Sequence, residues 1–208
     1  MQNRYAQIQF FAANYSRLQG LREVPVGMLV IFASVWAMYT QGDLGAPLLA
    51  VIGAILLYWL IDRYYANVFG RIKQTPKMRK WELSASILGG LLALLAFWLD
   101  TARDLPVSVL GVLFAFVLFE DFWRATVILK ERSFSQYPEN LIAAFVILAL
   151  SLLPLSGLAW WKIVGMRSQV LGMLFIIGIL MVLAGIWGHI RIIRALPVGE
   201  AKPDDYTL

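Results

Sequence analysis

The sequence predicts an all-α integral membrane protein, with six transmembrane helices in three hairpins after an amphipathic N-terminal helix. The chain is 60% hydrophobic and only 15% charged, its mean hydropathy is +0.71, and its apolar residues collect into six separate runs. A soluble domain of 208 residues could not bury so much apolar surface, so lipid is expected to solvate most of it. The same composition excludes a disordered chain.

Residues 1–23 are predicted to form an amphipathic helix that does not span the membrane. Apolar and aromatic residues recur there every three or four positions, which is the period of one helix face, while basic and polar residues occupy the other face. Basic polar faces favour lipid headgroups, so we expect this helix in the inner interface. Docking onto a partner protein is the alternative.

The six apolar runs define a transmembrane domain over residues 24–196. The runs cover residues 26–40, 46–62, 83–99, 106–129, 141–155 and 170–189. The first run is short for a hydrocarbon layer of about 30 Å, but Pro25 suits a first helical turn and aromatic ends extend the span. Pro154 is expected to kink or end the fifth helix. Residues 197–208 are polar and contain proline, which predicts a disordered cytoplasmic tail.

The distribution of basic residues predicts the orientation. The N-terminus, the 2–3 connection, the 4–5 connection and the C-terminus hold 3, 6, 3 and 3 of the 18 Lys and Arg residues. The outer turns hold only Arg103, Lys162 and Arg167. Lys and Arg collect on the cytoplasmic side of membrane proteins, so both termini are expected in the cytoplasm and the chain in an inner or plasma membrane. Anionic lipid at that face is the expected partner.

The second and fourth runs resemble each other, which indicates an internal repeat. The alignment that matches Pro47 with Pro106 also matches Asp62 with Asp121, Arg71 with Lys130 and Lys73 with Arg132. The third hairpin offers only a loose counterpart in His189. Internal repeats are common in transporters, but duplication of a hairpin also produces scaffolds without transport.

Five charged residues inside or beside these runs form the candidate site: Asp62, Arg63, Glu120, Asp121 and Arg124. Charges within a span are expensive and mark function by default. On one helix Arg124 can reach Glu120 at i,i+4 or Asp121 at i,i+3, whereas adjacent residues such as Asp62 and Arg63 point apart. We therefore expect pairs between helices, such as Asp62 with Arg124 or Glu120 with Arg63.

Three interpretations of this set stay open. It is a charge network that fixes helix register near the cytoplasmic face, an ion or proton pathway, or a docking surface for a cytoplasmic partner. His189 is the only histidine, which predicts no metal or haem site and leaves a pH-sensing role as the alternative to an interfacial residue.

Small residues and tryptophans follow membrane patterns. Four-residue spacing recurs in Ala46, Ala50 and Ala54, in Ala85, Gly89 and Ala93, in Ser86 and Gly90, and in Ala184 and Gly188. Such spacing favours close helix packing inside the chain, with a homodimer face as the alternative, and the third run has the strongest such face. The eight tryptophans, Trp160 and Trp161 among them, are expected in two aromatic belts at the membrane surfaces.

The chemistry that the sequence excludes narrows the function. The chain has no cysteine, which removes thiol catalysis, disulfides and Fe–S clusters, and it has no nucleotide-binding or hydrolase motif. We expect no enzyme activity, cofactor or nucleic-acid partner, although Glu120 and Asp121 leave a lipid-directed enzyme open. The expected function is a non-catalytic subunit or regulator of a membrane complex. The alternative is a small ion- or proton-coupled transporter or channel that uses Asp62, Glu120 and Asp121.

Overall fold

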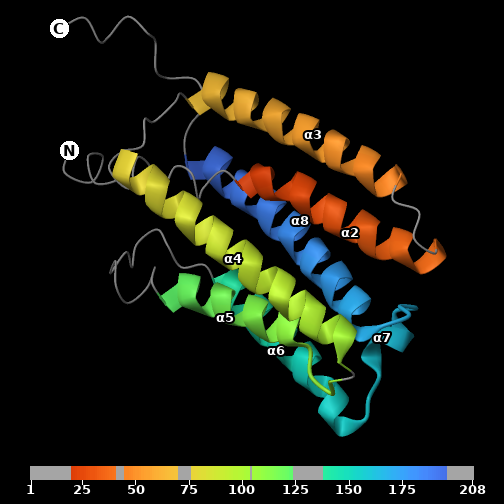
Figure 1. Cartoon of the computed structure of the whole chain (residues 1–208). Coiled ribbons are helices and arrows are strands. Elements are labelled where there is room, and N and C mark those ends of the chain that lie inside the picture. The colour runs from red at the N-terminus through yellow and green to blue at the C-terminus, as the bar shows by residue number, and fades with distance from the viewer. Residues whose placement is uncertain (1–19, 41–44, 70–75, 104, 124–137, 196–208) are drawn as a thin grey trace, which may run out of the picture.

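The computed structural model describes residues 20–40, 45–69, 76–103, 105–123 and 138–195, and this part of the chain is helical with no strand (Figure 1). In chain order the helices are η1 (Gly20–Arg22), α2 (Glu23–Tyr39), α3 (Gly45–Phe69), α4 (Pro76–Ala102), α5 (Val109–Trp123), α6 (Pro138–Leu152), η3 (Leu153–Ser156), α7 (Trp160–Ile163) and α8 (Gln169–Ala195).

Four helical stretches are long and apolar enough to cross a membrane. They are Gly20–Tyr39, Leu48–Asn67, Leu83–Ala102 and Gln169–Ile190. The predicted all-helical class with apolar spanning helices is therefore confirmed. Helices α5 and α6 have 15 described residues each, fewer than the ~20 that a span needs, so six spans in three hairpins remain a prediction. Most of the helix predicted over residues 1–23, and all of the tail 197–208, lie outside the described residues.

Prolines mark several helix boundaries. Pro76 and Pro138 are the first residues of α4 and α6, and Pro25 lies in the first turn of α2. Proline is tolerated there because the first N–H groups of a helix have no partner within it. Pro154 follows the end of α6 and lies in η3, which closes at Gly157 with φ 82°. That positive φ is accessible to glycine without steric penalty.

The closest helix pairs are not all neighbours in the sequence. Helix α8 makes its most extensive contacts with α2, and α5 makes its most extensive contacts with α6. Helix α3 lies beside α2, and α4 lies against α5 with a smaller contact to α8 (Figure 1). The chain alternates in direction, so the end of α3, the beginning of α2 and the end of α8 lie at the same end of the bundle (Figure 1).

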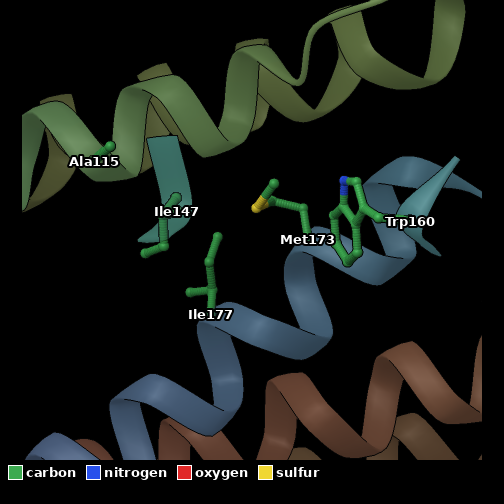
Figure 2. Packing of buried hydrophobic residues seen from close by; sticks show 5 residues of the cluster. All are labelled: Ala115, Ile147, Trp160, Met173 and Ile177. Carbon is green, nitrogen blue, oxygen red and sulfur yellow. The ribbon is translucent and has the colours of Figure 1, made fainter. Parts of the chain in front are cut away.

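The main core cluster joins α5, α6, α7 and α8. Figure 2 shows its members Ala115, Ile147, Trp160, Met173 and Ile177. The side chain of Trp160 is only 5% exposed, and its Nε1–H donates to the Leu150 carbonyl at 2.7 Å. The expectation that Trp160 belongs to a lipid-facing belt is therefore wrong. Its indole packs inside the protein because α7 turns it toward α6 and α8, and its one polar atom finds a partner there.

The connection between α4 and α5 is held by one carboxylate. Asp100, near the end of α4, accepts hydrogen bonds from Ser108 Oγ at 2.7 Å and from the backbone N–H groups of Val109 at 2.7 Å and Leu110 at 3.1 Å. These amides begin α5 and have no acceptor within that helix. Asp100 thus caps α5 from a neighbouring helix, and its negative charge complements the positive end of the helix dipole.

Candidate functional site

Charged and aromatic polar side chains meet where η1, the last turns of α3 and the last turns of α8 come together. We call this region the charged end, and define it by Arg22, Asp62, Tyr65 and His189. Three elements that are distant in the sequence supply these residues, so the site exists only in the folded chain.

Arg22 and Asp62 form an ion pair at the charged end. Arg22 Nη2 donates to Asp62 Oδ1, and the two side chains are 26% and 36% exposed. The Arg22 guanidinium also lies over the Tyr58 ring, with Cζ 5.7 Å from the ring centroid. This pair ties the beginning of α2 to α3. The sequence interpretation did not consider Arg22 as the partner of Asp62, because it placed Arg22 on the interfacial helix.

Arg63 has a different environment from its neighbour. Its side chain is exposed, and its guanidinium Cζ lies 4.2 Å from the centroid of the Trp59 ring. Such cation–π contact stabilises a charge while leaving N–H groups directed outward. The two adjacent residues Asp62 and Arg63 therefore act separately, one toward α2 and the other along its own helix.

The remaining members of the predicted set lie on or after α5. Glu120 is exposed on α5. Asp121 belongs to the same helix, but its side chain and the whole of Arg124 lie outside the described residues. Helix α3 contacts α2 and η1, whereas α5 packs against α4, α6 and α8. The expected pairs Asp62–Arg124 and Glu120–Arg63 thus stay predictions, and the partner that the structure gives to Asp62 is Arg22.

His189 lies at the centre of the charged end. Its Nδ1 is 3.1 Å from the hydroxyl of Tyr65, a side chain with no exposed surface. The rings of Tyr64 and Tyr65 both meet the imidazole edge to face, each with centroids 5.8 Å apart. The same Tyr65 hydroxyl accepts a long hydrogen bond of 3.4 Å from the backbone N–H of Leu21. The sequence pattern singled out His189 but not Tyr65.

Glycines let the helices approach closely beneath this site. A Cβ built on Gly185 would lie 2.7 Å from the Gly20 carbonyl oxygen, and one built on Gly27 would lie 2.8 Å from the Gly178 carbonyl oxygen. We call these contacts the glycine seam, which joins α8 to η1 at Gly20 and to α2 at Gly27. The glycines of the seam recur at a spacing of seven residues on each side, as Gly20 and Gly27 and as Gly178 and Gly185. This spacing of small residues is the sequence signal that could have predicted the seam.

Three other helical glycines have the opposite surroundings. Within the described part of the chain, no further heavy atom lies within 4 Å of a Cβ built on Gly53, Gly89 or Gly90. They belong to α3 and α4, which we call the open helices. In the spanning stretches of these two helices only 6% of residues are buried, against 33% in α8. On the small-residue face predicted for the third apolar run, Gly89 and Gly90 are therefore uncovered by the described residues, whereas Ala93 packs against α5 and α8.

The chemistry of the charged end is that of ion pairing and hydrogen bonding. Among the described residues, no group of three His, Cys, Asp or Glu side chains could hold a metal ion. The arrangement joins η1, α3 and α8 through the Arg22–Asp62 ion pair and the Tyr65–His189 hydrogen bond. No family model, curated protein or solved structure matches the chain.

Proposed function

We propose that the protein is a non-catalytic subunit or regulator of a membrane complex, and that the open helices α3 and α4 supply its contact with the partner. The observation that carries the proposal is the contrast between the glycines of the seam and those of the open helices.

A glycine within a helix is unfavourable unless something packs against it. Relative to alanine it costs about 1 kcal/mol of helix stability. In lipid there is no hydrophobic driving force that brings helices together, so their association depends on van der Waals packing. Small residues allow that packing to be close, and the close contact offsets the cost of the glycine. Gly20, Gly27, Gly178 and Gly185 have this compensation within the chain. Gly89 and Gly90 lack it in the described structure, which supports a helix of another molecule as their contact.

The position of the open helices also suits a partner. Helix α3 is exposed along most of its length, with Leu49 and Ile55 71% and 62% exposed. Lipid alone can cover a single exposed apolar residue in a membrane. Two long helices with so few buried residues leave broad apolar surfaces on which a helix of another protein can pack. This supports interaction over catalysis as the role of the chain.

The test is recovery of the complex from native membranes in a mild detergent or a polymer nanodisc. The matched variants are Gly90→Leu, which fills the open face of α4, and Ala149→Leu, which also introduces a leucine at an exposed position of α6. We expect the wild-type chain and Ala149→Leu to bring down a stoichiometric membrane partner, and Gly90→Leu to lose it while folding normally. A chain that is recovered alone, stable and monomeric would overturn the proposal.

The proposed topology has six spans with both termini in the cytoplasm of an inner or plasma membrane. Helices α5 and α6 are then the two short spans, and the amphipathic helix of residues 1–23 lies along the inner surface. Because the chain has no cysteine, single cysteines can be introduced without background. Labelling by a membrane-impermeant maleimide in whole cells should reach Ser156→Cys and not Lys80→Cys. The reverse pattern would overturn the orientation.

The transporter alternative has less support. It assigns Asp62, Glu120 and Asp121 as coupling groups. The Asp62 carboxylate already accepts from Arg22, so a cation at this position would have to displace a guanidinium. Glu120 lies on α5, which packs with a different set of helices from α3.

A further inference from the structure

Helix α3 lies beside α2 at the edge of the bundle and has two different faces (Figure 1). Its inner face carries the buried Tyr65 and the partly buried Ala50 and Ala54. The opposite face carries large side chains, and all of them are exposed. We call this face the outer stripe, and its members are Leu49, Ile52, Leu56, Trp59 and Arg63.

The outer stripe forms one continuous line along the helix. Its members follow one another at intervals of three or four residues, which places them within about 80° of one another around the helix axis. The apolar part of the stripe, from Leu49 to Trp59, rises about 15 Å. That is half of a hydrocarbon layer of about 30 Å, so the stripe is as long as one leaflet of a membrane is deep.

The outer stripe ends in a positive charge. Arg63 follows Trp59 by one helical turn, and its guanidinium Cζ lies 4.2 Å from the centroid of the Trp59 ring. Side chains on a helix lean toward its N-terminus, so the guanidinium lies back along the stripe, over the indole. Arginine and tryptophan are both suited to the boundary between acyl chains and headgroups.

The charge of Arg63 is not neutralised within the described part of the chain. The adjacent acid, Asp62, is directed elsewhere and pairs with Arg22. The contact that the structure gives to the Arg63 guanidinium is the face of Trp59, and stacking on a ring leaves the N–H groups of arginine free to donate. A phosphate matches these donors, because two of its oxygens can accept from one guanidinium at once.

We propose that the outer stripe binds one anionic phospholipid, whose phosphate is held by Arg63 beside Trp59 and whose acyl chain lies along the rest of the stripe. A zwitterionic lipid carries its own cation next to the phosphate, which competes with the guanidinium, so a headgroup of net negative charge is preferred. A free phosphate ion would leave the apolar length of the stripe unused. The site does not rest on the proposed function, which depends on Gly89 and Gly90 of α4.

The test measures which lipid lies against Trp59. The full-length chain is placed in phosphatidylcholine nanodiscs that contain a small, equal fraction of either phosphatidylglycerol or phosphatidylcholine with brominated acyl chains, which quench tryptophan fluorescence on contact. The quenching that belongs to Trp59 is obtained by subtracting the signal of Trp59→Phe. We expect brominated phosphatidylglycerol to occupy the site about fivefold more than brominated phosphatidylcholine, which is the contribution of one basic residue.

Two outcomes in the wild-type chain would overturn the proposal. Equal quenching of Trp59 by the two lipids would show that the stripe does not select a headgroup. No quenching by either lipid would show that protein covers the stripe. An excess of glycerol 3-phosphate should leave the preference unchanged, and its loss would assign Arg63 to a soluble phosphate compound instead of a lipid.

Variants of the arginine test its role, each compared with its own Trp59→Phe form. Arg63→Gln should quench equally with both lipids, and Arg63→Lys should keep part of the preference, because it retains the charge without the planar fork. Arg194→Gln is the matched control, since it removes the same charge from an exposed position of α8. It should keep the fivefold preference, and an equal loss in Arg194→Gln would assign the effect to overall charge and contradict the site.

Discussion

The α2–α8 pair and the open helices α3 and α4 use the same residue type in opposite ways. In the glycine seam the carbonyl oxygen of Gly20 lies where a Cβ on Gly185 would need space, whereas Gly53, Gly89 and Gly90 lie in open surroundings. The difference teaches that a glycine in an apolar helix indicates close helix packing only where another helix lies against it. The α2–α8 pair makes the most extensive contacts in the described bundle, and each of the other two helices is also held by hydrogen bonds near its end.

Those end contacts follow a common plan. Asp100 on α4 accepts from the first amides of α5, and Tyr65 on α3 accepts from the Leu21 amide at the beginning of η1. Each open helix thus satisfies backbone donors of the helix beside it, which have no partner of their own at a helix beginning. Four substitutions or pairs of substitutions test this division between a closed pair and two anchored open helices.

The largest effect is expected in the seam. Gly185→Leu would place a side chain against the Gly20 carbonyl oxygen and the Val24 side chain, at 2.7 and 2.8 Å from the Cβ alone. We expect the free energy of unfolding to fall by about 3 kcal/mol, measured by denaturant titration in detergent micelles. Gly53→Leu is the control and should unfold at the wild-type midpoint or above it. Equal losses in both variants would erase the distinction between seam and open helices.

The next effect concerns the anchor of α4. Asp100→Ala removes the acceptor for Ser108, Val109 and Leu110, and should lower the free energy of unfolding by about 1–2 kcal/mol. Asp100→Asn retains one carbonyl acceptor and should recover part of the loss. Unfolding in micelles gives the comparison, and an Ala variant as stable as the wild type would show that packing alone anchors the helix.

A smaller effect of opposite sign is expected on the open face. Gly90→Ala adds a methyl group where the described chain leaves room, so it should raise the free energy of unfolding of the isolated chain by about 0.5–1 kcal/mol through helix propensity. The measurement is made on the purified chain without partner. Destabilisation would reveal a neighbour against Gly90 within the same molecule.

The smallest effect belongs to the ion pair of α3. A double-mutant cycle with Arg22→Ala and Asp62→Ala should give a coupling of about 0.5 kcal/mol, because both side chains are partly exposed and such pairs contribute little. A coupling several times larger would make the ion pair the main anchor.

The sequence predicted several residues of the candidate site, but it did not predict which residues they contact. Asp62 was selected because an ionisable group inside or beside an apolar run demands a partner, and His189 because it is the only histidine. Arg22 and Tyr65 were missed as their partners, and Arg22 was assigned to the interfacial helix of residues 1–23. The local sequence shows which polar side chains would be costly to leave without a hydrogen-bond partner. It does not show the partner, which lies 40 residues away in the sequence for Asp62 and 124 residues away for His189.

The sequence by itself determined the helical class and the apolar stretches, because in lipid every backbone group must find its hydrogen bond within the segment. Length and hydropathy are properties of each stretch alone. Only the tertiary structure decided that α8 pairs with α2, that Trp160 is a core residue and that Gly89 and Gly90 meet no other helix within the described part of the chain. These outcomes depend on which helix surfaces approach within van der Waals distance. Helices of similar composition present similar apolar surfaces, so composition alone does not determine which of them pair.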